Sequence, residues 1–178
     1  MDKRMLKLKI RRAAPYDIPK VSVLESLIEG KNAASLETLE KRFAVFPRGF
    51  IVAESPMGIA GYAESCRWNL KAGDFETFEQ IKNFPAHHKR DGKNLYVIFV
   101  AVKEDYKKQG IGSDLVNTLV DYAEGNEISK VQLVSKEKLV PFYKKLGFAS
   151  VAELPDFLPD TPPHTFMEKY ISPRSRNV

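Results

Sequence analysis

The sequence is poor in the residues that build disulfides and metal sites. Its one cysteine, Cys66, cannot form a disulfide within the chain and excludes zinc sites that use two or more thiolates. The three histidines, His87, His88 and His164, are too few and too badly spaced to form a histidine cage. We therefore expect a protein without a metal site.

Long apolar runs are also missing. The longest, residues 95–102, is far shorter than the roughly 18 residues that a membrane-spanning helix needs. The basic N-terminal residues 1–12 alternate polar and apolar side chains and contain no signal-peptide core. Together with the scarcity of cysteine, these absences predict a cytoplasmic protein with no membrane contact.

The composition fits one ordinary folded domain. The chain has 178 residues, 43% of them hydrophobic and 29% charged, which excludes intrinsic disorder and fibrous classes. We expect a single domain over residues 1–178 with a frayed tail at residues 172–178. The net charge of +5 suits an anionic small ligand. The lysines are interspersed with acids and no RNA-binding aromatic motif is present, so we expect no nucleic acid partner.

The hydrophobic pattern predicts one mixed α/β domain. Strands are expected at residues 6–12, 50–54, 59–68, 95–102, 131–134, 148–154 and 165–171, and helices at residues 18–28, 36–43, 111–123 and 139–146. Residues 95–102 are apolar on both faces, which is typical of a central buried strand. Residues 69–93 are polar and irregular, and we expect there a long loop with one helical turn, either a lid or a solvated excursion.

The first predicted helix has its apolar positions at helical spacing, namely Ile18, Val21, Leu24, Leu27 and Ile28. Pro15 and Asp17 precede this helix as a start signal. Ser35 is typical of the residue that caps the second helix.

The segment with a chemical signal lies between the buried strand and the amphipathic helix that follows it. Gly110 and Gly112 let the backbone turn sharply and approach a ligand, and the first turn of the helix offers unpaired N–H groups. These features favour phosphate binding, with Lys107 and Lys108 adding charge. A plain strand–helix turn is the alternative. A P-loop is excluded, and Leu115 stands where a dinucleotide fingerprint needs a small residue.

A second motif follows at residues 140–148, VPFYKKLGF. The two motifs together resemble the GNAT superfamily of acyl-CoA-dependent N-acetyltransferases, whose loop reads [Q/R]-x-x-G-x-[G/A]. Lys107 departs from that pattern, because it keeps the charge and loses the planar fork of arginine. The resemblance implies a mixed, mostly antiparallel sheet of six to seven strands with about four helices. It also implies acetyl-CoA as cosubstrate.

Residues 136–148 look nearest to arylalkylamine (serotonin) N-acetyltransferases. Those enzymes have two histidines on the fourth strand, and the matching positions here are Tyr96 and Ile98. The histidine relay is therefore absent, and we do not carry over specificity for aromatic amines.

The resemblance also assigns roles to residues. The cofactor-binding set comprises Val100, Ala101 and Val102, which would pair with the pantetheine arm, and Lys107, Lys108, Gln109, Gly110, Ile111, Gly112 and Ser113, which would hold the pyrophosphate. The expected catalytic residues are Tyr143, Glu64 and Tyr96. Tyr143 would act as the acid for the departing thiolate, with packing beside Phe142 and Phe148 as the alternative.

The base is harder to assign. Glu64 and Cys66 share a face of the strand at residues 59–68, and a carboxylate there would accept the proton of the amine. The alternatives for Glu64 are that it attracts the ammonium group without proton transfer or that it faces solvent at the sheet's edge. Cys66 is interpreted as a small buried side chain.

The predicted function is transfer of an acetyl group from acetyl-CoA to a small primary amine, by direct attack in a ternary complex. The alternatives are a protein or peptide N-acetyltransferase and a non-catalytic acyl-CoA-binding sensor. The sequence leaves a homodimer open.

Overall fold

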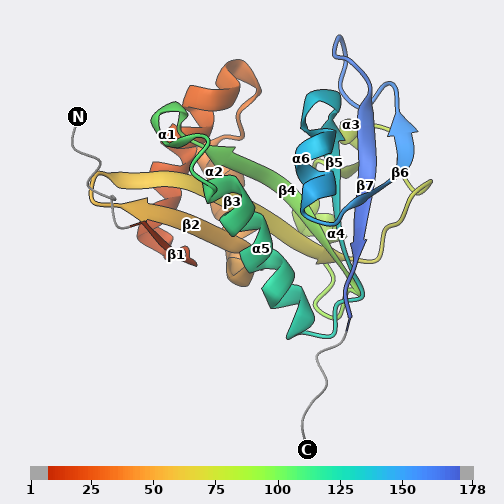
Figure 1. Cartoon of the computed structure of the whole chain (residues 1–178), viewed down its shortest axis with the longest axis horizontal. Coiled ribbons are helices and arrows are strands. Elements are labelled where there is room, and N and C mark those ends of the chain that lie inside the picture. Colours follow the sequence, from red (N-terminus) through yellow and green to blue (C-terminus); the bar gives the residue numbers. More distant parts are fainter. Residues whose placement is uncertain (1–7, 173–178) are drawn as a thin grey trace, which may run out of the picture. The chain divides into compact units, whose positions relative to one another are not determined.

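The computed structural model describes residues 8–172 and has the element order that the sequence predicts, with two short helices added within residues 69–93 (Figure 1). The strands are β1 (Lys9–Arg12), β2 (Phe50–Ser55), β3 (Gly58–Trp68), β4 (Asn94–Val102), β5 (Lys130–Lys136), β6 (Ala149–Leu154) and β7 (His164–Tyr170). The α-helices are α1 (Ile18–Glu29), α2 (Leu36–Val45), α3 (Phe78–Ile81), α4 (Phe84–His87), α5 (Ile111–Glu124) and α6 (Val140–Lys145).

The strands form a seven-stranded mixed sheet in the order β1-β2-β3-β4-β5-β7-β6. The predicted α/β fold is confirmed, with six α-helices among residues 8–172 where about four were expected. The predicted strand at residues 6–12 starts at Lys9 within the described part of the chain. Residues 6 and 7 and the tail at 173–178 lie outside the described residues.

The chain divides into two compact units, Met1–Ser65 with Phe99–Leu119 and Cys66–Ile98 with Val120–Val178. Strands β3 and β4 and helix α5 contribute residues to both units. The single domain expected over residues 1–178 stays a prediction.

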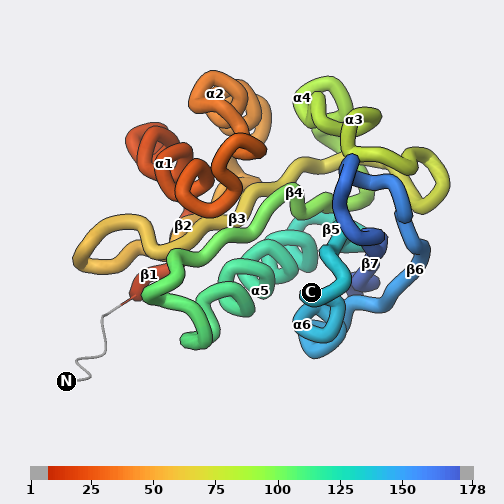
Figure 2. Tube along the Cα trace, turned by 90° about the horizontal axis from the view of Figure 1, so that it is seen from above, coloured from red at the N-terminus to blue at the C-terminus, as the bar shows by residue number. Residues whose placement is uncertain are grey.

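In the first unit, helices cover both faces of antiparallel strands. Strand β2 pairs with β1 and with β3, and Phe50 stands opposite Glu64 in the second of these ladders. Helices α1 and α2 lie on one face of β2 and β3, and α5 lies on the other (Figure 2). The core that forms between α1, α2 and the strands consists of Ile18, Val21, Leu24, Leu39, Phe50, Val52, Ile59, Tyr62 and Ala101.

The buried face of α1 differs from the predicted one at its C-terminal end. Leu27 and Ile28 are 74% and 42% exposed, whereas Glu25 is only 5% exposed. At 3.6 residues per turn, Leu27 lies half a turn away from Ile18, while Glu25 lies almost directly below it. Helical geometry therefore places a carboxylate on the core face and a leucine on the outer face.

In the second unit, β7 pairs antiparallel with β5 and β6, and β5 pairs parallel with β4. The core there is mostly aromatic and consists of Cys66, Trp68, Phe75, Ile81, Phe84, Tyr96, Leu154, Phe157 and Phe166.

The expectation of a polar loop at residues 69–93 is wrong in part. The segment contains α3 and α4, and it contributes Phe75, Ile81 and Phe84, each at most 4% exposed. Phe75 and Phe84 pack against Trp68, with ring centroids 5.7 Å and 6.5 Å away. These apolar side chains are too widely spaced to give a periodic pattern in the sequence. In the structure they nevertheless form part of the core of the second unit.

A chain of buried hydrogen bonds crosses the strands of the second unit. Trp68 Nε1 donates to Gln132 Oε1 over 2.7 Å, and Gln132 Nε2 donates to Glu168 Oε1 over 2.9 Å. Lys130 Nζ donates to the other oxygen of Glu168 over 3.0 Å. Gln132 is fully buried, so each of its polar atoms depends on this network.

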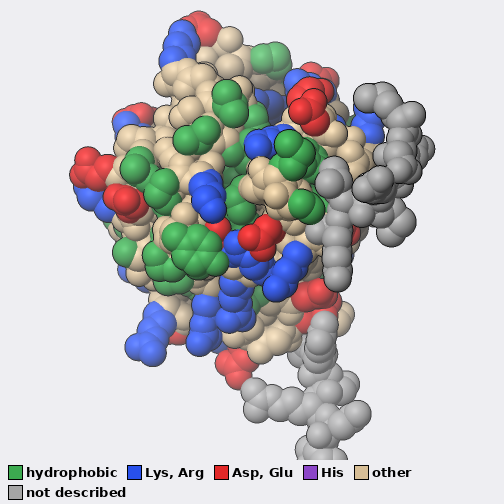
Figure 3. All heavy atoms as spheres, turned by 90° about the vertical axis from the view of Figure 1, so that its left-hand side faces the viewer, with side chains coloured by type: hydrophobic (Ala, Val, Ile, Leu, Met, Phe, Trp, Pro, Cys, Tyr) green, Lys and Arg blue, Asp and Glu red, His purple; other side chains and the backbone are tan. Residues whose placement is uncertain are grey.

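The face of the molecule drawn in Figure 3 carries charges of both signs. Lysine and arginine side chains lie beside aspartate and glutamate, with apolar side chains among them. The surplus of positive charge in the composition is thus mixed with acidic groups on this face.

Candidate functional site

The glycine loop, residues 107–113, adopts the backbone shape of an anion-binding turn. The sign of φ alternates along it, being −64° at Lys107, +61° at Lys108 and +84° at Gly110, while Gln109 is outside the positive region. Alternation of this kind turns successive N–H groups to one side and forms a concave array that binds anions. A left-handed lysine costs about 1–3 kcal/mol, a strain that is common at functional sites.

Helix α5 begins directly from this loop. The first helical bond that the structure gives here is from Asp114 N–H to the Gly110 carbonyl, at 3.0 Å. Helix geometry leaves the N–H groups of Ile111, Gly112 and Ser113 without helical acceptors. Ile111 is buried and anchors the helix start, whereas residues 107–110 are exposed. The buried Ile111 therefore fixes the loop at the start of the helix, while residues 107–110 remain accessible to a ligand. The positive end of the α5 dipole lies at this same start.

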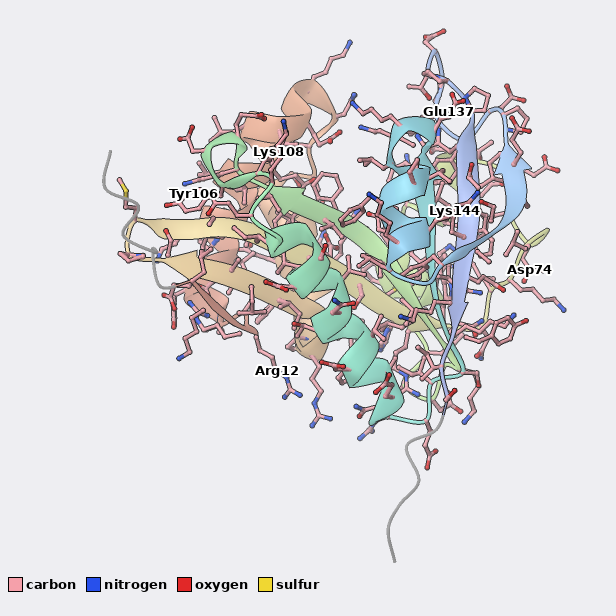
Figure 4. The ribbon with its side chains drawn as sticks, in the orientation of Figure 1. Arg12, Asp74, Tyr106, Lys108, Glu137 and Lys144 are labelled. Carbon is pink, nitrogen blue, oxygen red and sulfur yellow. The ribbon has the colours of Figure 1, made fainter. Side chains whose placement is uncertain are left out.

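A contact of Tyr106 attaches the start of the loop to the rest of the first unit. Tyr106, which precedes the loop, is 8% exposed, and its hydroxyl lies 3.0 Å from Ser55 Oγ. Lys107 Nζ pairs with Glu104 at 2.6 Å on the surface. Tyr106 and Lys108 both come from the segment that joins β4 to α5 (Figure 4).

The last part of β4 directs its backbone groups in two directions. The Ala101 carbonyl approaches Gly61 so closely that a Cβ there would stand 2.7 Å from it, and Lys103 N–H donates to the Ala60 carbonyl. Residues 101 and 103 therefore face β3. Because successive residues of a strand alternate, the N–H and C=O groups of Val100 and Val102 point away from β3.

The parallel ladder between β4 and β5 is short. It runs from Asn94↔Lys130 to Val97↔Leu133, and within the described second unit it includes no pair of Ile98 with Val134. Strand β5 continues beyond this point in register with β7. The expectation that residues 95–102 are buried on both faces holds for Leu95–Val97 and Ala101, whereas Ile98, Phe99, Val100 and Val102 are half-buried.

Glu64 lies in the interior of the first unit, so the alternative of an exposed glutamate at the sheet's edge is wrong. Its side chain is fully buried, and Arg42 Nη1 on α2 lies 3.2 Å and 3.4 Å from its two oxygens. Burial raises the pKa of Glu64 to about 7, although Arg42 opposes this shift, and the nearby Glu25 adds to it. A carboxylate with such a pKa changes protonation state near neutral pH.

Sequence reasoning missed the groups around Glu64. Tyr62 donates a 2.5 Å hydrogen bond to Glu25 Oε2, and Ala34 N–H donates to Glu25 Oε1 at 2.7 Å. Burial and the two carboxylates raise the pKa of Tyr62 well above its usual value. A signal was present, because Glu25 and Arg42 each occupy a position on the apolar face of an amphipathic helix.

The second unit contains the two predicted catalytic tyrosines. Tyr96 is 3% exposed and packs against Trp68 in a tilted arrangement, with ring centroids 4.1 Å apart. Its pKa is raised by burial first, and then by the charges of Cys66 and Tyr143, so these three groups lie within electrostatic range of one another. Tyr143 is 8% exposed, and burial raises its pKa to about 12.

The predicted site residues are thus distributed over both units. The first unit contains Glu64, Val100, Ala101, Val102 and the glycine loop, and the second contains Tyr96 and Tyr143. The catalytic and binding roles of all these residues stay predictions.

Comparison with known proteins identifies the family. A sequence model described as Acetyltransferase (GNAT) family matches residues 21–148, more than half of the chain. The chain belongs to this family. Membership of the GNAT family supports an acyl-CoA-dependent acyltransferase. A search of curated protein sequences gives no match.

Several solved structures have a similar fold. The loading GNATL domain of CurA from Lyngbya majuscula has a TM-score of 0.80 at 18% identity, covering 92% of this chain and 97% of that one. A GNAT-like decarboxylase, GphF, in complex with isobutyryl-CoA has a TM-score of 0.77 at 17% identity, covering 92% and 100%. The ribosomal-protein-S18-alanine N-acetyltransferase from Escherichia coli has a TM-score of 0.68 at 17% identity, covering 96% and 98%. At these identities the likeness shows the GNAT fold alone.

No helix within residues 8–172 is long and apolar enough to cross a membrane. Over the same range, no three His, Cys, Asp or Glu side chains gather as metal ligands would.

Proposed function

We propose that this GNAT protein is an N-acetyltransferase that moves an acetyl group from acetyl-CoA to a small primary amine. The observation that carries the proposal is the path of β4. Its ladder with β5 ends at Val97↔Leu133, and the strand then runs through residues that are half-buried, except for the buried Ala101, toward the glycine loop. The groups of acyl-CoA come in a matching order, because the thioester and the amides of the pantetheine arm precede the diphosphate. The arm would lie along β4, and the diphosphate would lie at the glycine loop.

The binding roles follow from the direction of the backbone groups. Val100 and Val102 point their N–H and C=O groups away from β3, and all of these groups except the Val100 N–H supply hydrogen bonds to the amides of the pantetheine arm. Ala101, whose carbonyl faces Gly61, contributes its small side chain. The loop N–H groups of residues 109–113, with Lys107 and Lys108, bind the pyrophosphate.

Glu64 is the proposed base. An alkylamine resembles lysine, with a pKa of about 10.4, and must lose a proton before its nitrogen can attack. With its pKa of about 7, Glu64 is partly ionised at neutral pH and accepts that proton, directly or through water. The nitrogen then forms a bond to the thioester carbon, and the C–S bond breaks with its electron pair going to sulfur. The Val100 N–H polarises the carbonyl.

Tyr143 is the proposed acid. With a pKa of about 12 it stays protonated at neutral pH, so it donates a hydrogen bond to the departing thiolate. A thiol with a pKa near 8.5 is the stronger acid of the two. Tyr143 therefore stabilises the leaving sulfur mainly as a donor rather than by complete proton transfer. Tyr96, within electrostatic range of Tyr143, stays a proposed member of the site.

Calorimetric titration of the full chain with acetyl-CoA tests the binding step. Gly110 has φ +84° with open space around it, so Gly110→Ala and Gly110→Asp share the same backbone strain. Only the aspartate brings a negative charge to the phosphate position, and we expect it to abolish binding that the alanine variant largely keeps. Gly73→Asp, at φ +91° and also in open space, is the matched control. Equal affinity of the two Gly110 variants would contradict the phosphate assignment.

Release of free thiol from acetyl-CoA and isobutyryl-CoA, with a panel of arylalkylamines, polyamines and peptides, tests the reaction. Turnover with small amines supports the proposal. Turnover with peptides alone would replace it by a peptide or protein acetyltransferase, which the resemblance to arylalkylamine enzymes does not favour. Binding without turnover would leave an acyl-CoA sensor.

A cytoplasmic location and a homodimer are part of the proposal. Cell fractionation measures the location, and light scattering measures the oligomeric state.

A further inference from the structure

Four ionisable side chains are buried together in the first unit, where α1 and α2 cover β3. Arg42 lies 3.2 Å and 3.4 Å from the two oxygens of Glu64, and the two side chains are 10% and 0% exposed. Glu25 is 5% exposed and accepts hydrogen bonds from the Tyr62 hydroxyl and from Ala34 N–H. Tyr62 and Glu64 are two residues apart on β3 and share its helix-covered face.

This cluster has more acidic than basic groups. Two carboxylates and one guanidinium lie out of water, and an excess negative charge in such surroundings is costly. The charge of Arg42 favours the ionised form of Glu64, whereas the charge of Glu25 opposes it. A residue of α2 therefore favours the ionised form of Glu64, and a residue of α1 favours its protonated form.

The neighbours of Glu64 can be followed element by element. Arg42 faces it from α2 and Glu25 from α1, while Tyr62 comes from its own strand. Opposite it on β2 stands the uncharged Phe50. From β4, Phe99 packs on Tyr62 with ring centroids 5.8 Å apart.

We propose that Arg42 and Glu25 are positioning residues that set the protonation state of Glu64 in opposite senses. Arg42 also fixes the orientation of the carboxylate, because it contacts both oxygens. The consequence for turnover rests on the proposed function, in which Glu64 is the base. The effect on Glu64 itself does not depend on that function.

The test follows the carboxyl carbon of Glu64 by NMR during pH titration of the full chain. Glutamate is labelled with carbon-13 at the carboxyl position, and the Glu64 signal is assigned by its absence from Glu64→Gln. In Arg42→Gln the titration midpoint should rise by about 1–3 units, the usual effect of a neighbouring opposite charge. In Glu25→Gln the midpoint should fall. This amide still accepts from Ala34 N–H and can donate to the Tyr62 oxygen, so the fold should persist.

Arg48→Gln and Glu40→Gln, exposed changes on the same unit, are the matched controls and should leave the midpoint unchanged. The acidic limb of the turnover profile is measured on the same variants. Midpoints that move as expected while that limb stays fixed would support the inference and remove Glu64 as base. A Glu64 midpoint that stays fixed or rises in Glu25→Gln would overturn the inference, whether or not Arg42→Gln folds.

Discussion

The hydroxyls of Tyr106 and Ser55 lie 3.0 Å apart and connect the start of the glycine loop to the β2–β3 hairpin. Ser55 Oγ also donates to the Gly58 carbonyl at the other side of the same hairpin. The turn that presents the loop is thus held by a residue far away in the sequence.

Tyr106→Phe removes this hydroxyl and keeps the ring. Because a typical hydrogen bond contributes about 0.5–1.5 kcal/mol, urea denaturation should show a loss of that size. The loop loses an attachment, so calorimetry should also show weaker binding of acetyl-CoA. Tyr16→Phe, at a residue 65% exposed, should change neither quantity. Unaltered affinity in the Tyr106 variant would show that the loop is held without this contact.

Lys108→Gly should separate stability from binding. It relieves the left-handed strain of φ +61°, so the free energy of unfolding should stay level or rise by up to about 1 kcal/mol. It also removes a charge beside the proposed phosphate, so the affinity for acetyl-CoA should fall. Glu127→Gly, at φ +56°, relieves equal strain in the second unit and should leave affinity unchanged. Full affinity in the Lys108 variant would remove that lysine from the binding set.

Gln132→Leu should destabilise the second unit. It leaves Trp68 Nε1 and one oxygen of Glu168 without their partner, and each buried unsatisfied group costs about 1–3 kcal/mol. Trp68 is the only tryptophan, so its fluorescence reports the transition in urea directly. Gln109→Leu, at an exposed glutamine, should shift the midpoint little. Similar midpoints for the two variants would mean that water replaces the lost partner.

The stability of Glu64→Gln relative to the natural protein should depend on pH. In the folded chain the pKa of Glu64 is about 7, whereas an unfolded glutamate has about 4.3. Between these values the folded state binds the extra proton, so the contribution of Glu64 to stability is present at low pH and is lost as pH rises. The cost of the glutamine substitution should therefore shrink by roughly 3 kcal/mol from pH 4.5 to pH 8. A cost that grows with pH would contradict the raised pKa.

Tyr143→Phe should lower turnover with little change in the affinity for acetyl-CoA. Because its pKa is about 12, the phenol is protonated throughout pH 6–9, and the loss should be the same fraction at each pH in that window. Phe142→Leu, on the neighbouring ring, controls for packing. Equal turnover in the tyrosine variant would assign Tyr143 to the core.

The parts that could be predicted from the sequence are those with local causes. Ser35 accepts from Thr38 N–H and caps α2, as its position indicated. The glycine loop and α5 likewise lie where the two glycines and the apolar pattern after them predict a turn and a helix. The pairing of Arg42 with Glu64 could not be predicted, because it joins a helix to a strand 22 residues away. Phe75 and Phe84 were missed because single aromatic residues in a polar segment give no period.

The burial of Cys66 has a practical consequence. Its thiol is 4% exposed among the aromatic side chains of the second unit, and the chain has no other cysteine. A thiol-reactive dye added to the folded protein should thus remain nearly colourless, leaving the coenzyme's sulfur as the only fast signal. The slow labelling that remains would measure the rate at which this aromatic core opens, so Cys66 reports local unfolding without an introduced probe.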